Sequence, residues 1–195
     1  MKVYLVQARN PDDIAKGEEL DCFALQTGLS LSQIHSINIA TDPFELQHVL
    51  DADAVLVGGA GEFSVLDDDL RVKNFINVLG ELTATEIPLF ASCFGFQALV
   101  LALGGTIVKD VPNAEVGTYE LETTDSAKND PLFSDIPKSF LAQLGHQDQA
   151  RVLPLTVEHL ANQLYNPYLG KKYYDINGSL IIKVLPFPFS LSTEI

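Results

Sequence analysis

Short apolar runs recur along the first half of the chain, separated by longer segments with helical spacing. An apolar run of about five residues, bounded by polar or turn residues, is typical of a strand that is buried on both faces. Because these runs lack strict polar alternation, they favour a parallel sheet over an antiparallel sheet with one solvated face. We predict four such strands, at Val3–Gln7, Ile34–Ala40, Ala54–Val57 and Ile87–Ala91.

The segments between these runs have apolar residues three and four positions apart, which is the spacing of an amphipathic helix. Gly28 is a natural end for the first of these helices. Asp42 suits the N-cap of the second helix, and Pro43 suits its first position. The predicted helices are Ile14–Gly28, Asp42–Leu50, Leu66–Leu82 and Phe94–Leu103. Alternation of strands and helices predicts an α/β fold, with a mostly parallel sheet covered by helices on both faces.

The character of the chain changes after Gly105, where strand-like pieces follow one another with only turns between them. These pieces are Thr106–Asp110, Val116–Thr123, Phe140–His146 and Lys172–Phe187. They predict a small antiparallel extension that then returns to the main sheet. No repeat or linker interrupts the sequence, so we predict one domain over residues 1–195.

Composition narrows the possible partners. The 195 residues carry a formal net charge of −14, which disfavours nucleic acid and anionic membranes because both require a basic surface. Cys22 and Cys93 are the two cysteines and form no Cys-x-x-Cys motif, so we expect no metal site, no cofactor and no disulfide framework. Cys22 lies on a predicted helix face and is expected to be buried and inert. Without a recognisable signal peptide or apolar span, a cytoplasmic location is the default expectation.

The most informative stretch is the junction of the fourth strand with the fourth helix. Cys93 follows the strand directly, Gly95 stands two places later, and the helix starts at about Phe94. This is the layout of a nucleophile elbow, which exposes a side chain at the top of a sheet. The helix N-terminus is expected to lower the pKa of the thiol, and its N–H groups can hold an oxyanion. The alternative is a buried structural cysteine.

A second loop leaves a parallel strand at the same edge of the sheet. It reads Gly58-Gly59-Ala60-Gly61, and glycine allows the backbone to approach a ligand closely. Its N–H groups are candidates for a second oxyanion donor, although a plain tight turn has the same pattern. Gln97, one helical turn after Cys93, either faces the cleft or bonds to a neighbouring strand. His146 follows a strand-like run and either faces the cleft or is structural.

Together, Cys93-Phe-Gly-Phe-Gln97, Gly58–Gly61 and Gly104-Gly105 resemble the motifs of class I, triad-type glutamine amidotransferase domains, in particular the stand-alone, GMP-synthase-like type. Gly145-His146-Gln147-Asp148 and Leu153-Pro154 extend the likeness over most of residues 1–165. The resemblance implies a flavodoxin-like three-layer sandwich. It also implies a cysteine that attacks the side-chain amide of glutamine, or a related γ-glutamyl amide, to release ammonia.

Carried over by position, the resemblance implies specific roles. Cys93 matches the nucleophile, and Gly59 and Phe94 match the backbone oxyanion donors. Gln97 matches a residue that lines the glutamine pocket, together with Gly58, Ala60 and Gly61 of the glycine loop. No synthetase domain is fused to these residues, so an ammonia acceptor would be a separate chain.

The main departure from the family lies near the end of the sequence. The family places its base and acid in a late Phe-His-Pro-Glu segment, whereas residues 185–195 contain no histidine, and residues 165–195 look divergent or truncated. We therefore predict impaired hydrolysis of glutamine, with His146 as a possible surrogate base. Two alternatives stay open: an inactive binding or regulatory protein of this fold, and another elbow-cysteine hydrolase or peptidase. Whether the chain is an active enzyme is left undecided by the sequence.

Overall fold

The computed structural model describes residues 1–163 and 182–184, and its centre is a parallel sheet. The sheet has four strands in the order β2-β1-β3-β4, and every neighbouring pair is parallel. The strands are β1 (Val3–Ala8), β2 (Ile34–Asn38), β3 (Ala54–Ala60) and β4 (Leu89–Ala91). This confirms the predicted parallel α/β sheet, and the order agrees with that of flavodoxin-like folds.

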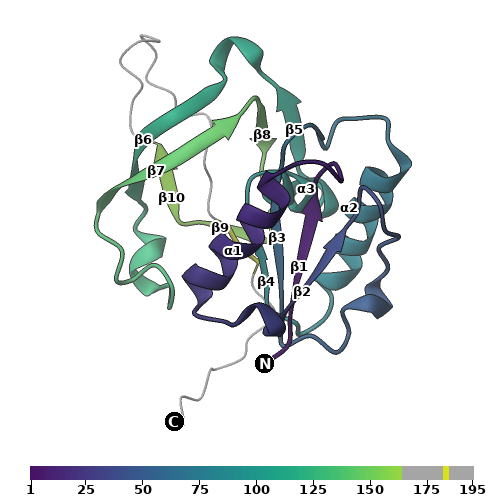
Figure 1. The fold of residues 1–195 in the computed structure, drawn as a ribbon. Coiled ribbons are helices and arrows are strands. Elements are labelled where there is room, and N and C mark those ends of the chain that lie inside the picture. The colour runs from purple at the N-terminus through teal and green to yellow at the C-terminus, as the bar shows by residue number, and fades with distance from the viewer. Residues whose placement is uncertain (164–181, 185–195) are drawn as a thin grey trace.

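Helices cover both faces of this sheet, as predicted (Figure 1). Helix α1 (Ala15–Thr27) covers one face, where Ala24 packs with β1 residues Val3 and Leu5. On the other face lie α2 (Leu70–Leu82) and α3 (Phe94–Ala102). They pack against the strand side chains that point to that side of the sheet, such as Val6 and Val57. The alternation of side chains along buried strands thus supplies two separate apolar layers.

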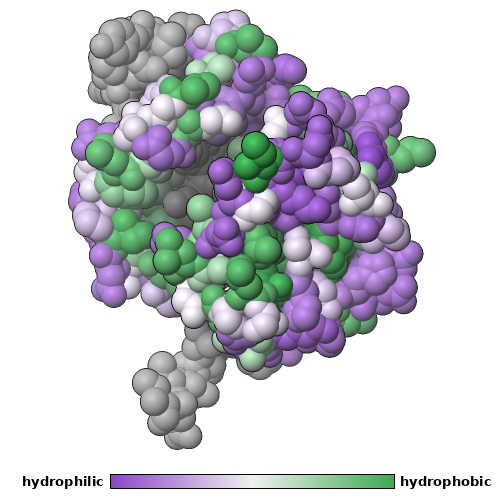
Figure 2. All heavy atoms as spheres, in the orientation of Figure 1, coloured by the Kyte–Doolittle hydropathy of each residue, from purple (hydrophilic) through white to green (hydrophobic). Residues whose placement is uncertain are grey.

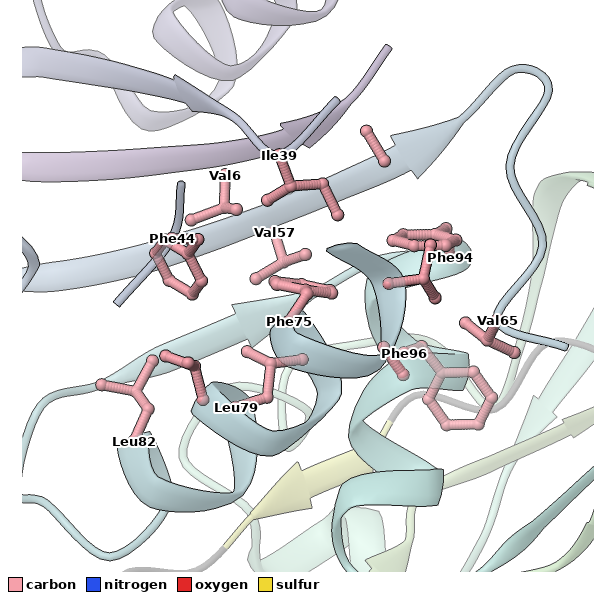
Figure 3. Close-up of a cluster of buried hydrophobic side chains, with 14 of the residues drawn as sticks. Val6, Ile39, Phe44, Val57, Val65, Phe75, Leu79, Leu82, Phe94 and Phe96 are labelled. Atoms are coloured by element: carbon pink, nitrogen blue, oxygen red, sulfur yellow. The ribbon is translucent and has the colours of Figure 1, made fainter. Parts of the chain in front are cut away.

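The larger of these layers contains a cluster of aromatic rings between α2 and α3 (Figure 3). Phe75 is fully buried, and its ring centroid lies 5.7 Å from that of Phe44 and 5.8 Å from that of Phe94. The rings of Phe75 and Phe94 are nearly parallel, with 10° between their planes. Because Phe94 is the first residue of α3, this stack fixes the start of the helix.

The predicted antiparallel extension is also present. It comprises β5 (Thr106–Lys109) with β8 (Asp148–Val152), and β6 (Glu115–Thr123) between β7 (Ser139–His146) and β10 (Ala161–Gln163). The expected return to the main sheet is not seen in the described part of the chain. There β11 (Ile182–Val184) pairs antiparallel with β9 (Val157–His159).

Four local predictions need correction. The edge strands β2 and β4 are not buried on both faces as predicted, and Phe90 of β4 is 50% exposed. The segment predicted as the helix Asp42–Leu50 contains only a single 3-10 turn, Leu46–His48. Helix α2 starts at Leu70 rather than at residue 66, since Asp69 is its N-cap and accepts a hydrogen bond from the Arg71 N–H. Cys22 is exposed rather than buried, because α1 buries little beyond Ala24.

Most of residues 165–195, which the sequence marks as divergent or truncated, lies outside the described residues, so the single-domain assignment for 1–195 stays a prediction. Among the helices that the structure describes, none is long and apolar enough to cross a bilayer. Figure 2 shows hydrophilic side chains over much of the face that carries α1, with hydrophobic side chains in smaller groups between them.

Candidate active site

The turn between β4 and α3 holds Cys93 in an unusual backbone conformation. Cys93 has φ 50° and ψ −108°, and among the described residues it is the only one other than glycine with a positive φ. Such conformations cost about 1–3 kcal/mol and concentrate at functional sites. Three backbone hydrogen bonds hold the turn: Ser92 N–H to Val57 O, Gly95 N–H to Ser92 O, and Gln97 N–H to Cys93 O. The strand-to-helix elbow predicted from the sequence is therefore present.

Gly95 is required by the packing of this turn. A Cβ placed on Gly95 would lie 2.5 Å from Val57 Cγ1 and 3.1 Å from the Val57 carbonyl oxygen. Real Cβ atoms do not approach other atoms so closely. Glycine at this position therefore lets α3 begin directly against β3, which brings Cys93 to the edge of the parallel sheet.

We expect Gly95→Ala to destabilise the protein by about 1–3 kcal/mol, because the added methyl group overpacks the contact with Val57. Gly17→Ala is the matched control, since in the described part of the chain no atom lies within 4 Å of the position that its methyl group would take on α1. There alanine should be neutral or stabilising by up to about 1 kcal/mol, because glycine is a poor helix former. Urea unfolding of both variants measures the difference. Equal stability of the two would show that the turn tolerates a side chain at position 95.

The environment of the Cys93 thiol differs from the sequence-based expectation. Burial raises the pKa of Cys93 above its ordinary value; a hydrogen bond from the Phe94 N–H and the charge of Arg9 act in the lowering direction. Glu19 and Asp148 add negative charge that raises this pKa further. The predicted lowering by the helix N-terminus is therefore outweighed by desolvation. At neutral pH the sulfur is a thiol, so its activation requires a base.

The glycine loop lies beside Cys93, as the common sheet edge predicts. A Cβ built on Gly59 would be 3.7 Å from Cys93 Cβ and 3.7 Å from an Arg9 nitrogen. The Gly59 N–H, however, already donates a hydrogen bond to Glu19 Oε1 at 2.9 Å. A substrate oxygen would have to replace this carboxylate before Gly59 could act as an oxyanion donor.

Glu19 belongs to a partly buried polar network that the sequence analysis missed. Its carboxylate also accepts hydrogen bonds from Arg9 Nη2 at 3.1 Å and from Gln7 Nε2 at 2.9 Å. Arg9 in turn contacts Asp13 at 3.3 Å. These residues lie where β1 ends beside β3, which is the point where ligands bind in open α/β sheets. The available sequence signal was a polar Gln7 and a charged Arg9 at the end of an apolar strand.

A cavity of about 230 Å³ opens beside the Cys93 thiol. It is lined by the β4–α3 turn, the start of α3, the end of β7 and the start of β8. Of the predicted site residues, Cys93, Gln97 and His146 line it. Residues 58–61 and Phe94 are not among its described lining residues. The structure thus brings Cys93, Gln97 and His146 together around one space, with the glycine loop adjoining Cys93.

Gln97 is held in place by the extension. Its side chain is buried, and Nε2 donates a hydrogen bond to the Asp148 carbonyl oxygen at 2.8 Å. The Asp148 carboxylate accepts a hydrogen bond from Ser64 Oγ. This is the bond to a neighbouring strand that the sequence left as one of two readings for Gln97. It ties α3 to β8 and so closes one wall of the cavity.

His146 ends β7 opposite Glu115, which begins β6, and the two are register partners. His146 Nε2 lies 3.4 Å from Glu115 Oε2, and the exposed fractions of the side chains are 12% and 8%. Burial lowers the pKa of His146, and burial raises the pKa of Glu115 to about 7. The sequence analysis did not single out Glu115, because its partner is distant in sequence and only the β6–β7 pairing places them together.

The family model described as "Glutamine amidotransferase class-I" matches residues 25–167. The chain belongs to the class I glutamine amidotransferase family. This confirms the resemblance that the Cys93 turn and the glycine loop indicated.

Among curated relatives, the GMP synthase [glutamine-hydrolyzing] of Thermosipho africanus is 35% identical over 132 residues, which is 67% of this chain and 23% of that protein. A glutamine-hydrolyzing GMP synthase subunit of Methanocaldococcus jannaschii is 33% identical over 92 residues, 47% of this chain and 45% of that protein. The chain therefore spans less than half the length of these relatives.

Solved structures share the fold at low sequence identity. A glutamine amidotransferase from Thermotoga maritima has a TM-score of 0.64 at 18% identity, covering 83% of this chain and 66% of that one. Another glutamine amidotransferase, from Methylobacillus flagellatus, has a TM-score of 0.63 at 17% identity, covering 83% of this chain and 61% of that one. These neighbours confirm the flavodoxin-like architecture.

Proposed function

We propose that this amidotransferase domain uses Cys93 to attack the side-chain amide of glutamine, or of a related γ-glutamyl amide, and that turnover is slow. A thioester forms as ammonia leaves, and water then releases glutamate. The observation that carries this proposal is the strained Cys93 backbone at the edge of a cavity of about 230 Å³. That volume is below the roughly 300–1,000 Å³ of pockets for drug-sized ligands and suits a substrate of amino-acid size.

The proposed oxyanion donors are the backbone N–H groups of Phe94 and Gly59. The Phe94 N–H already faces the Cys93 sulfur, and Gly59 adjoins Cys93. Use of Gly59 requires its hydrogen bond to Glu19 to break. Loss of one oxyanion donor costs about 100- to 1,000-fold in rate, so this contact by itself supports slow turnover. Gly58, Ala60, Gly61 and Gln97 stay candidates for substrate contact.

The supply of protons further supports slow turnover. Of the four histidines in the sequence, His146 lines the cavity with Cys93. His35 packs against Tyr4, and His159 bonds to the Ala161 carbonyl oxygen. The late segment in which the family carries its base contains no histidine here. General acid–base catalysis contributes about 100- to 10,000-fold, so an imperfect surrogate at His146 would lower the rate strongly.

Ammonia release from glutamine tests this proposal. We expect the chain to release ammonia at least about 100-fold more slowly than a family member with an intact late His-Pro-Glu segment, because acid–base assistance is weakened. A coupled glutamate assay on both proteins at equal concentration provides the comparison. Release at the rate of the intact relative would refute the proposed impairment.

A second candidate is a protein of this fold that binds glutamine without turning it over. The contact between Glu19 and the Gly59 N–H and the raised pKa of Cys93 both favour it. Calorimetric binding of glutamine with no detectable ammonia would support this candidate over slow catalysis.

The names of the relatives support a proposal about partners. One curated relative is named as a single subunit of GMP synthase. We extend the proposal to a separate synthetase chain that accepts ammonia from this domain. A cytoplasmic setting is part of the same proposal, since both cysteines are free and cysteines stay reduced in that compartment.

A further inference from the structure

The pairing of Glu115 with His146 has no evident structural benefit. Each side chain is close to nine-tenths buried, at the join between the parallel core and the extension. Burying two ionisable groups side by side costs free energy unless hydrogen bonds satisfy them. An apolar pair at these register positions would stabilise the hairpin at no such cost.

The hydrogen bonds of this pair are also incomplete. His146 Nδ1 and Glu115 Oε2 are buried and have no hydrogen-bond partner among the described residues, and the same holds for Oε1 of the neighbouring Gln149. Buried polar atoms without partners are uncommon in folded proteins and call for an explanation. His146 and Gln149 both line the cavity that contains the Cys93 thiol. A bound substrate or water in this cavity would supply the missing partners of His146 and Gln149.

We infer that Glu115 and His146 form a dyad, borne by the β6–β7 hairpin, that moves protons for Cys93 in place of the family's late histidine and acid. This inference rests on the proposed function. Nε2 of His146 lies 3.4 Å from Glu115 Oε2, although the two atoms make no hydrogen bond in the described structure. In the proposed dyad a small shift lets the Nε2–H donate to this carboxylate, which leaves Nδ1 to accept another proton. Glu115 is a positioning residue, since it acts on the substrate only through His146.

The proton path balances over one reaction. Nδ1 of His146 accepts the proton of the Cys93 thiol while the sulfur bonds to the amide carbon. The proton passes to the leaving nitrogen as the carbon–nitrogen bond breaks, and ammonia departs. Water then bonds to the thioester carbon after giving a proton to His146. The carbon–sulfur bond breaks, and the proton returns to the sulfur.

The charges around the dyad give it a defined pH dependence. His146 faces Glu115 from β6 and Asp148 from β8, and Cys93 faces Arg9, Glu19 and Asp148. Glu115 has a pKa of about 7, so it gains negative charge as the pH rises through 7. That charge stabilises a protonated His146 and therefore favours removal of the thiol proton. The reactivity of Cys93 should rise through about pH 7, below the pKa that burial alone would give this thiol.

The test is the rate of Cys93 alkylation by a chloroketone analogue of glutamine between pH 5.5 and 9.5. All variants carry Cys22→Ser, which removes the exposed second thiol. We expect Glu115→Gln and His146→Gln each to slow alkylation at pH 8 by roughly 10- to 100-fold and to move its rise to higher pH. Glu115→Asp should restore part of the rate. Glu120→Gln is the matched control, an exposed glutamate on the same strand, and should leave the profile unchanged.

The outcomes separate the two proposals. Alkylation of Cys93 at the unmodified rate and pH profile in both Glu115→Gln and His146→Gln would overturn the dyad and leave the nucleophile standing. No alkylation of Cys93 in the protein with intact Glu115 and His146 would overturn both. A urea midpoint for each variant separates a loss of reactivity from a loss of folding.

Discussion

Cys93→Ser should abolish both covalent capture of a glutamine-like chloroketone and any release of ammonia from glutamine. The hydroxyl of serine holds its proton far more tightly than a thiol, and a weak surrogate base cannot remove it. We expect a loss of at least about 1,000-fold, because catalytic groups that act as a unit lose nearly all their benefit together. Mass spectrometry of the labelled protein and an ammonia assay measure the two effects.

The second cysteine provides the control for this experiment. Cys22 is exposed on α1, so a small general alkylating agent should reach it first. The glutamine analogue should instead label Cys93, where the cavity can hold its amino-acid portion. Cys22→Ser should therefore leave capture by the analogue unchanged. Labelling that followed Cys22 rather than Cys93 would contradict the assignment of the nucleophile.

Phe75→Ala should produce the largest loss of stability in the fold, about 3–5 kcal/mol. The side chain is fully buried, and its ring packs between those of Phe44 and Phe94 (Figure 3). Truncation leaves a cavity that the surrounding rings cannot fill. Since a domain is stable by only about 5–15 kcal/mol, the variant should be close to unfolding. Thermal unfolding should show a midpoint lower by roughly 6–20 °C.

Leu70→Ala is the matched control on the same helix. Leu70 is the first residue of α2 and is 81% exposed, so its truncation should change stability by less than about 0.5 kcal/mol. Equal losses for the two variants would show that the cluster of rings does not carry the stability of α2. Because Phe94 begins α3 beside Cys93, Phe75→Ala should also slow alkylation of Cys93 in whatever fraction stays folded.

The parallel core was predictable because its signals are local. The central strands β1 and β3 are short buried apolar runs, and Gly28 ends the first helix in the left-handed conformation that glycine favours. The segment 42–50 shows the limit of such signals. Asp42-Pro43 suits the start of a helix, yet the chain forms only the 3-10 turn Leu46–His48, and Phe44 packs into the aromatic cluster. Tertiary packing there outweighed the local preference.

The candidate site was predictable in part for the same reason. The strand–Cys93–x–Gly95–helix pattern is a local turn, so the sequence predicted its position, whereas the positive φ of Cys93 was seen only in the structure. The electrostatics of the thiol were not local. Burial raises the pKa of Cys93 although a helix begins beside it, since desolvation depends on every element that packs over the sulfur. Glu19 and Arg9 reach this region from α1 and from the end of β1.

The sequence by itself determined the class of fold, the family and the identity of the candidate nucleophile, because these follow from short local motifs and from the order of strands and helices along the chain. Only the tertiary structure decided which polar groups surround that nucleophile. Glu19 accepts a hydrogen bond from the N–H of Gly59, which lies 40 residues later in the sequence. Glu115 contacts His146 only because β6 pairs with β7. Charge and desolvation act through space, so they depend on the packing of distant segments.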